Sequence, residues 1–250
     1  MRYFLVFSYF GKAYHGWQRQ PNAITVQEVL EETLSTVLKK SIALVGAGRT
    51  DTGVHAKQMV AHFDCDEIAE KDRFIHKCNA FLPEDIALSE ILQVTTDAHA
   101  RFDALERTYA YWITTRKNPF YTDSAYYIKN TLSVEVLNKA ASVLLEYTNF
   151  ECFSKSNTDV KTYQCHITKA MWTQDEDKMV FTITADRFLR NMVRAIVGTL
   201  LEVASGKLTM ADLNAVIESK NRANAGFSVP AKGLYLMKVT YPERIYITHG

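Results

Sequence analysis

One short segment of the chain combines glycine with a cation and a carboxylate. It reads Val45-Gly46-Ala47-Gly48-Arg49-Thr50-Asp51-Thr52-Gly53-Val54-His55-Ala56. The glycines allow backbone conformations and close approaches that other residues resist. A carboxylate beside an arginine favours its ionised form, which suits a nucleophile or a hydrogen-bond acceptor better than an acid. The segment therefore predicts a loop that presents Arg49 and Asp51 for chemistry.

Two other interpretations of this loop are open. The first is an ordinary glycine-rich turn with a surface ion pair. The second is a dinucleotide-binding loop of a nicotinamide-dependent oxidoreductase, because Gly46-x-Gly48 begins like that fingerprint. Asp51 occupies the third glycine position, where its charge would face a pyrophosphate, and no Gly-Lys-Ser/Thr follows. The sequence therefore disfavours the oxidoreductase and excludes a P-loop.

Apolar periodicity predicts the elements that position the loop in the first half of the chain. They are a strand (3–9), a helix (26–40), an apolar run (42–45), a strand (59–63), a helix (71–80) and a strand (86–94). This β-α-β-β-α-β order is typical of a ferredoxin-like unit. A polar stretch, 95–106, follows it and predicts a seam between a domain at 1–104 and a second at 105–250.

The second half again alternates strands with helices. The expected elements are a strand (107–114), a helix after Ser133, a hairpin of two strands (164–173 and 179–185), helices (188–204 and 209–218) and a last strand (233–241). The polar loop 154–162 is expected to be mobile. No sequence repeat of fixed period links the halves, so a duplicated architecture rests on element order alone.

Composition limits the classes of protein that the chain can form. Of its 250 residues 47% are hydrophobic and 23% charged, as in soluble globular proteins. The net charge is only +1, so any binding of nucleic acid must come from a local basic patch. The four cysteines form no C-x-x-C pair and no metal-ligand spacing, which predicts free thiols and no metal site. No apolar run reaches transmembrane length, so we expect a cytoplasmic protein without a membrane partner.

The segment from Gly48 to Ala56 resembles the signature of the tRNA pseudouridine synthase A family, and Asp51 stands at the position of the family's catalytic aspartate. A second block, Tyr14-x-Gly16-Trp17-Gln18-Arg19-Gln20, resembles the family's N-terminal motif. The resemblance implies that Trp17 and Arg19 contact RNA. A packed loop is the alternative for this block.

Three later blocks extend the resemblance over nearly the whole chain. Arg107-x-Tyr109-x-Tyr111 is similar to the family's second motif, which implies that Tyr109 stacks on the target base, with proton abstraction as a second role. Phe188-Leu189-x-x-Met192-Val193-Arg194-x-Ile196-Val197-Gly198 is similar to the third, which implies an ion pair from Arg194 to Asp51. Val229-Pro230-Ala231-Lys232-Gly233-Leu234-Tyr235-Leu236 is similar to the C-terminal block. Leu189 and Leu234 would help to form the uracil pocket.

Some of these residues have plainer interpretations. Core packing is the alternative for Tyr109. Arg187, Arg190 and Arg194 stand three and four residues apart, which also fits a solvated flank of the expected helix; if functional, Arg187 and Arg190 are expected to contact phosphates. The sequence departs from the family pattern at Glu106 and in Phe150-Glu151-Cys152-Phe153. These departures affect RNA contacts rather than the catalytic assignment.

The resemblance implies an isomerase that converts uridine to pseudouridine at positions 38, 39 and 40 of the tRNA anticodon stem-loop, without a cofactor and as a homodimer. Asp51 would be the nucleophile, attacking either C6 of the base or C1′ of the ribose, and Arg49 would help to displace the nucleotide. The implied α/β (α+β) fold has two ferredoxin-like, RNP-like halves, whose mainly antiparallel sheets form a central sheet and an RNA cleft. The rival interpretation is a non-catalytic RNA-binding protein with the same fold, against which Asp51 and Arg194 argue.

Overall fold

The computed structural model describes residues 1–129, 132–155, 160–175 and 178–247. The chain divides into two compact units: Met1–Leu105 together with Leu236–Gly250 (unit 1), and Glu106–Tyr235 (unit 2). The last strand thus belongs to the first unit from Leu236 on. The sequence-based boundary at residue 104 stays a prediction. Within the described ranges, no helix is long and apolar enough to cross a membrane.

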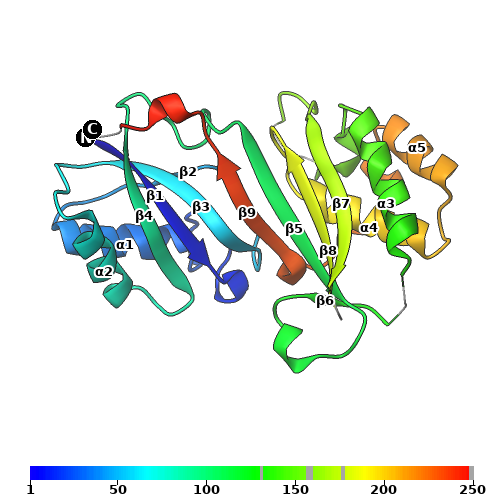
Figure 1. Ribbon diagram of the computed structural model, residues 1–250, viewed down its shortest axis with the longest axis horizontal. Coiled ribbons are helices and arrows are strands. Elements are labelled where there is room, and N and C mark those ends of the chain that lie inside the picture. Colours follow the sequence, from blue (N-terminus) through cyan, green and yellow to red (C-terminus); the bar gives the residue numbers. More distant parts are fainter. Residues whose placement is uncertain (130–131, 156–159, 176–177, 248–250) are drawn as a thin grey trace. The chain divides into compact units, whose positions relative to one another are not determined.

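Unit 1 contains the element order that the first half of the sequence predicts. It runs β1 (Arg2–Tyr9), α1 (Val26–Leu38), β2 (Val45–Gly46), β3 (His55–Asp64), α2 (Lys71–Phe81) and β4 (Ile86–Val94). β1 lies between β3 and β4 and is antiparallel to both, β2 pairs with β3, and β9 (Leu234–Thr240) is also a neighbour of β3. The predicted β-α-β-β-α-β order is therefore confirmed (Figure 1).

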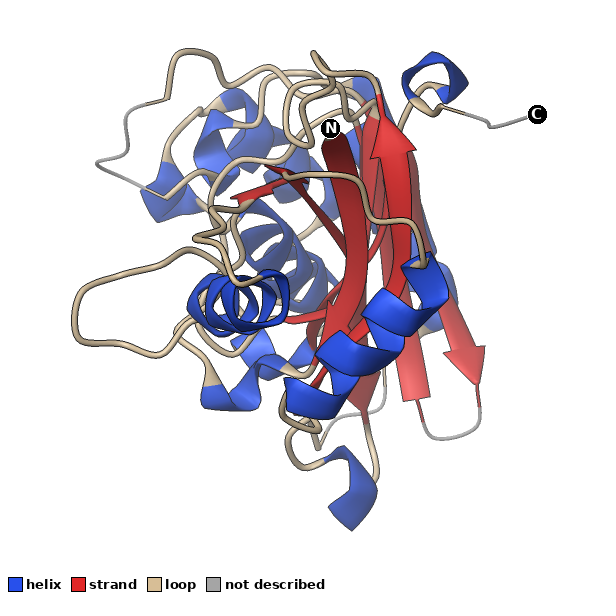
Figure 2. Cartoon of the chain, turned by 90° about the vertical axis from the view of Figure 1, so that its left-hand side faces the viewer, coloured by secondary structure: helices blue, strands red, loops and turns tan. Residues whose placement is uncertain are grey.

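Local chemistry explains where these elements begin and how they pack. Thr25 caps α1 by accepting a hydrogen bond from the Glu28 amide, and the helix ends where Lys39 turns left-handed at φ 55°. In β1, every residue from Tyr3 to Phe7 is buried, so both faces of this central strand are covered. In Figure 2 the strands are red and the helices are blue.

Unit 2 is built on an antiparallel sheet of β5 (Glu106–Thr114), β8 (Lys178–Ala185) and β7 (Ile167–Asp175), in that order. A two-residue strand, β6 (Tyr126–Tyr127), pairs with the end of β5. The helices are α3 (Val134–Val143), α4 (Met192–Ala204) and α5 (Met210–Glu218). The predicted hairpin is confirmed as β7 and β8. Its tip at 176–177, and part of the loop that we expected to be mobile (156–159), lie outside the described residues.

The helix expected from Phe188 begins four residues later, at Met192. Asn191 takes a left-handed conformation (φ 67°, ψ 0°) that a helix interior does not allow, and its side-chain amide donates to the Ser228 hydroxyl at 2.6 Å. The Lys155 amide donates to the Arg190 carbonyl at 3.0 Å. The predicted start was too early because Leu189 continues the apolar spacing of the helix. The contacts with Ser228 and Lys155 instead hold 187–191 outside the helix. Arg187 and Arg190 therefore do not lie on a flank of α4.

Candidate functional site

The predicted catalytic loop of unit 1 connects two strands that pair with each other. β2 pairs with β3 through Val45–His62 and Gly46–Ala61, and the Ala47 amide donates to the Val60 carbonyl at 2.8 Å. The chain then leaves the sheet, forms a turn in which the Val54 amide donates to the Asp51 carbonyl at 3.1 Å, and returns at His55. Arg49 is exposed and Asp51 is partly exposed. Both ends of the loop join the paired strands β2 and β3, so the sheet fixes the position of the segment that carries Asp51.

The N-terminal block supports this loop through the backbone. The Trp17 amide donates to the Thr50 carbonyl at 3.3 Å, and the Gly53 amide donates to the Tyr14 carbonyl at 3.3 Å. Gly16 lies between these contacts at φ 86°, where an added Cβ would stand 2.3 Å from the Thr50 carbonyl oxygen. Only glycine allows both that conformation and that approach. The two motifs, far apart in the sequence, therefore form one structure around Asp51.

Side chains complete the support. The Tyr9 and Thr50 hydroxyls share a hydrogen bond of 2.8 Å, and Nδ1 of His55 accepts from the Gly11 amide at 2.9 Å. The His55 ring also stacks on Phe10, with ring centroids 4.1 Å apart. These contacts hold Thr50, directly before Asp51, and His55, four residues after it, against β1 and the segment that follows β1.

Two residues predicted to contact RNA have partners inside unit 1. Trp17 is only 3% exposed; its ring stacks on Phe7 and lies over Gly46. It is therefore placed to support the loop rather than to present a surface, which differs from its predicted role. Arg19 is about half exposed, and its guanidinium lies 3.3 Å from carboxylate oxygens of both Glu28 and Glu31 on α1.

Tyr109 lies on β5 of unit 2, opposite Ile183 of β8. Its ring meets that of Phe188 edge-to-face, at 86° and with centroids 5.1 Å apart. The side chain is half-buried, so its packing against Phe188 fixes one edge while part of the residue stays accessible. Phe188 belongs to the third motif but had no predicted role, and its contact with Tyr109 indicates one.

Arg194 and the C-terminal block are joined by hydrogen bonds. Nε of Arg194 donates to the Val229 carbonyl at 2.7 Å, and the Val229 amide donates to the Arg194 carbonyl at 3.3 Å. The Tyr111 hydroxyl donates to the neighbouring Pro230 carbonyl at 2.7 Å. Burial raises the pKa of Tyr111, which keeps this hydroxyl protonated as a donor. Three of the predicted motifs thus meet in unit 2.

Asp186, directly after β8, has two arginines, Arg107 and Arg187, among its hydrogen-bond partners. The Asp186 carboxylate accepts from the amides of His166 and Arg187, both at 2.7 Å, and its backbone carbonyl accepts from the Arg107 guanidinium at 2.8 Å. Arg190 is exposed. Leu189 and Leu234, predicted to line a uracil pocket, are 5% and 7% exposed. Asp51 and Arg194 belong to different units, so the ion pair between them stays a prediction.

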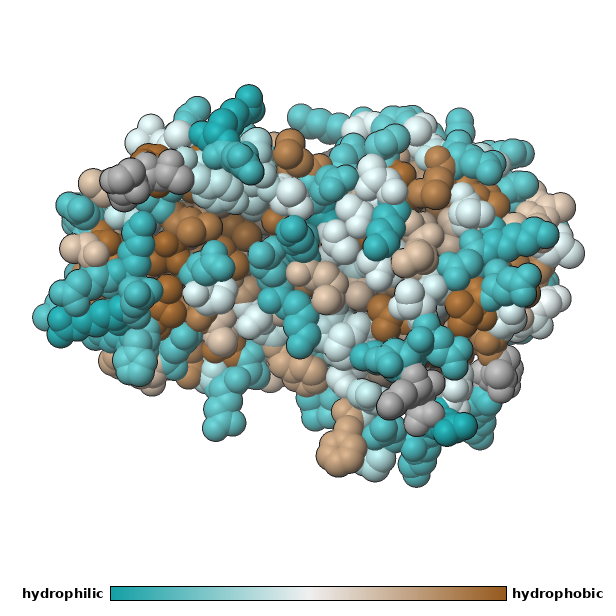
Figure 3. Space-filling view, in the orientation of Figure 1, coloured by the Kyte–Doolittle hydropathy of each residue, from teal (hydrophilic) through white to brown (hydrophobic). Residues whose placement is uncertain are grey.

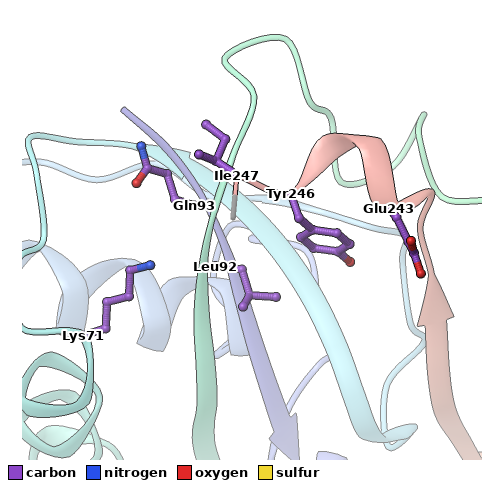
Figure 4. Close-up of a pocket in the computed structure, with 6 residues that line it drawn as sticks. All are labelled: Lys71, Leu92, Gln93, Glu243, Tyr246 and Ile247. Atoms are coloured by element: carbon purple, nitrogen blue, oxygen red, sulfur yellow. The ribbon is translucent and has the colours of Figure 1, made fainter. Parts of the chain in front are cut away.

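A cavity elsewhere in unit 1 contains none of these residues. It has a volume of about 410 Å³ and lies at the edge of β4, where it is lined by Lys71, Leu92, Gln93, Glu243, Tyr246 and Ile247 (Figure 4). Apolar surface over β1 and β4 is visible in the left half of Figure 3. Among the residues that the structure describes, no group of three or more His, Cys, Asp or Glu side chains is placed to hold a metal ion.

Comparison with known proteins gives one consistent answer. The family model described as tRNA pseudouridine synthase matches residues 5–103 and 140–242. The chain is 52% identical over 246 residues to a tRNA pseudouridine synthase A of Parabacteroides distasonis, covering 98% of each chain. It is 53% identical over 247 residues to that of Bacteroides fragilis, again covering 98% of each. The corresponding protein of Acetivibrio thermocellus is 39% identical over 239 residues, covering 95% of this chain and 98% of its own.

Proposed function

The chain belongs to the tRNA pseudouridine synthase family, whose members are isomerases, and we propose that it converts uridine to pseudouridine at positions 38, 39 and 40 of the tRNA anticodon stem-loop. The observation that carries this proposal is the loop around Asp51. The family signature at 48–56 and the N-terminal block at 14–20 are joined there by backbone hydrogen bonds.

The reaction breaks the bond between N1 of uracil and C1′ of ribose and forms a bond between C5 and C1′. The C5 hydrogen passes to water and N1 gains a proton, so there is no net oxidation. Asp51 is the proposed nucleophile, and its carboxylate adds either to C6 of the base or to C1′ of the ribose. Both routes lead to a freed uracil that turns before it bonds again.

The other site residues would hold the reacting nucleotide. Arg49 is proposed to fill the space that the displaced nucleotide leaves in the RNA stack. Tyr109 would stack on the uracil and could take up the C5 proton, and its edge-to-face contact with Phe188 supports a fixed ring. Arg194 would pair with Asp51 and fix its rotamer. Leu189 and Leu234 would complete the uracil pocket.

Cationic side chains would bind the RNA backbone. Arg187 and Arg190 are proposed phosphate contacts. The bond from the Arg187 amide to the Asp186 carboxylate and the bond from the Lys155 amide to the Arg190 carbonyl support this by holding the turn in one conformation. Arg19 is a weaker phosphate contact, since Glu28 and Glu31 already neutralise part of its charge. A homodimer in the cytoplasm would let modest basic patches of two copies act on one tRNA.

The proposal is tested by mapping pseudouridine on a defined substrate. An unmodified tRNA transcript with uridines at 38, 39 and 40 is incubated with the wild-type protein and with Asp51→Ala. Carbodiimide treatment and primer extension then locate the product. We expect stops at these positions with the wild type alone. Stops only elsewhere in the tRNA would overturn the site assignment. Binding without any stop would favour the non-catalytic RNA-binding protein.

A further inference from the structure

The loop between β5 and α3 carries the most exposed of the large apolar side chains that the structure describes. Phe120 is 90% exposed. Single apolar residues on a surface are common and need no explanation by themselves. This one lies in the segment 115–129, here called the Phe120 loop, which projects from the sheet of its own unit (Figure 1).

Hydrogen bonds within the Phe120 loop hold the backbone that carries the ring. Pro119–Tyr121 form a single 3-10 turn that begins at Asn118, whose side-chain oxygen accepts from the Phe120 amide at 3.0 Å. The Thr122 hydroxyl donates to the Pro119 carbonyl at 2.9 Å. A capped turn with a proline in its first position loses little backbone freedom when the ring that it carries binds a partner.

The C-terminal block anchors the far side of the same loop. Nζ of Lys232 donates to the Thr122 carbonyl at 2.7 Å, and the Tyr235 hydroxyl donates to the Ser124 carbonyl at 2.8 Å. Ala125 is 1% exposed, and the next two residues pair with the end of β5 as β6. The fold thus fixes both ends of the loop and leaves the ring of Phe120 in solvent.

The charge of the loop indicates the partner. Its cationic side chains are Arg116, Lys117 and Lys129, and its only carboxylate is that of Asp123. The loop therefore carries a net charge of +2, whereas the whole chain carries +1. Arg116, Lys117 and Lys129 are all exposed. Another strongly exposed phenylalanine, Phe102 (75% exposed), already has the Arg101 guanidinium over its ring, 5.8 Å from the centroid. An exposed aromatic ring among cations is the combination that binds single-stranded nucleic acid.

We propose that the Phe120 loop is an additional RNA-binding element, in which Phe120 stacks on an unpaired base of the tRNA and Lys117 binds an adjacent phosphate. The proposal rests on the proposed function, since it takes the tRNA as the RNA. It adds a contact that lies outside the motifs shared with the family signature. The loop acts on binding of the substrate and not on the chemical step.

The test compares tRNA affinity among variants that differ only in the ring. Dissociation constants are measured by filter binding for the wild type, Phe120→Ala, Phe120→Leu and Phe120→Tyr. Loss of a stacked base is expected to weaken binding roughly 5- to 100-fold in the Ala and Leu variants. Phe120→Tyr keeps the ring and stays near wild type. Phe81→Ala, which removes a 58% exposed ring at the end of α2, is the matched control and binds as wild type does.

A second measurement separates the phosphate contact from the stacked base. In Lys117→Gln, the slope of log K against log salt falls by about 0.7 to 0.9, because one cation fewer displaces counterions. The rate at saturating tRNA remains that of the wild type in all these variants, while KM rises in the variants that bind weakly.

Two results would overturn the proposal. The first is unchanged tRNA affinity in Phe120→Ala. The second is a shift from dimer to monomer by sedimentation in that variant, which would make a second copy of the chain the partner of the loop. Failure of the proposed function is distinguished from failure of this proposal by the wild-type protein, which would then form no pseudouridine.

Discussion

The two units hold their proposed site residues by different means. In unit 1 the loop around Asp51 is held mainly by backbone groups, with the Thr50 carbonyl, the Trp17 amide and Gly16 in direct contact. In unit 2 the proposed residues are held by side chains, as in the bonds of Arg194 to Val229 and of Tyr111 to Pro230. Unit 1 should therefore be sensitive to small added atoms, and unit 2 to the loss of polar ones.

The largest expected effect comes from adding one methyl group in unit 1. Gly16→Ala places a Cβ 2.3 Å from the Thr50 carbonyl oxygen at a φ of 86°, so the loop must move. A displacement of about 1 Å at the proposed catalytic carboxylate of Asp51 should lower the single-turnover rate by roughly 100-fold. Gly206→Ala is the matched control, because φ is 76° there but the space is open. It costs about 1 kcal/mol of stability and leaves the rate unchanged. A fully active Gly16→Ala would contradict the backbone-held loop.

The second prediction is that acid destabilises unit 1 more than unit 2. His62 of β3 is buried, its Nδ1 accepts from the Ala100 amide at 3.1 Å, and its ring lies 4.6 Å from that of His99. Burial, together with the neighbouring His99 and Arg2, lowers the pKa of His62 to about 4. The unfolded chain, with a pKa near 6.5, binds a proton that the folded chain excludes. The contribution of neutral His62 to the free energy of unfolding is therefore fully present above pH 6.5. It is lost between pH 6.5 and 4, which lowers the free energy of unfolding by up to about 3 kcal/mol.

Hydrogen exchange at pH 7.5 and pH 5 measures this difference for each unit. Amides of unit 1 should lose more protection than those of unit 2, whose buried groups with shifted pKa values among the described residues are tyrosines and thiols. Burial raises the pKa of Cys152 to about 12 and of Cys165 to about 11, so neither titrates in acid. His62→Gln should flatten the pH dependence of unit 1. Equal loss of protection in both units would refute the assignment to His62.

A smaller effect is expected from one hydroxyl in unit 2. Tyr111→Phe removes the donor to the Pro230 carbonyl and should cost about 1–2 kcal/mol in the free energy of unfolding, measured in urea. The rate should fall only a few-fold, since Arg194 keeps its own bond to Val229. Tyr235→Phe, which loses the bond to the Ser124 carbonyl, provides the comparison for a tyrosine outside the Arg194 contacts. A larger rate loss in Tyr235→Phe than in Tyr111→Phe would contradict this account.

The smallest effect is expected at Arg19. The Arg19 side chain is about half exposed, so Arg19→Ala should change stability by less than about 1 kcal/mol. If Arg19 contacts a phosphate, the salt dependence of tRNA binding should also decrease by about one unit of slope. An unchanged slope would leave Arg19 with only its contacts to α1.

Local patterns predicted the elements well and long-range contacts poorly. The order of β1 to β4 and the start of α1 at its Thr25 cap follow from apolar spacing and capping, which are properties of neighbouring residues. The start of α4 was wrong, because Asn191 is held by Ser228 and Arg190 by Lys155. No pattern within 186–194 contains that information.

The same distinction applies to the site. The assignment of Asp51 stays a prediction, and it rests on its own segment, since glycines, arginine and a carboxylate stand together in the sequence. The buried place of Trp17 over Gly46, and the contact of Phe188 with Tyr109, could not, because each joins residues separated by many positions. Side chains that support a site are therefore harder to predict from sequence than the residues that they support.

The most direct test of the account is tritium release from C5 of uridine in labelled tRNA under single-turnover conditions. Asp51→Asn keeps the size of the side chain and removes its charge. We expect this variant to bind tRNA with the affinity of the wild type and to release no tritium above background. Release at the wild-type rate from Asp51→Asn would show that this carboxylate does not carry the reaction, and the central claim would fall.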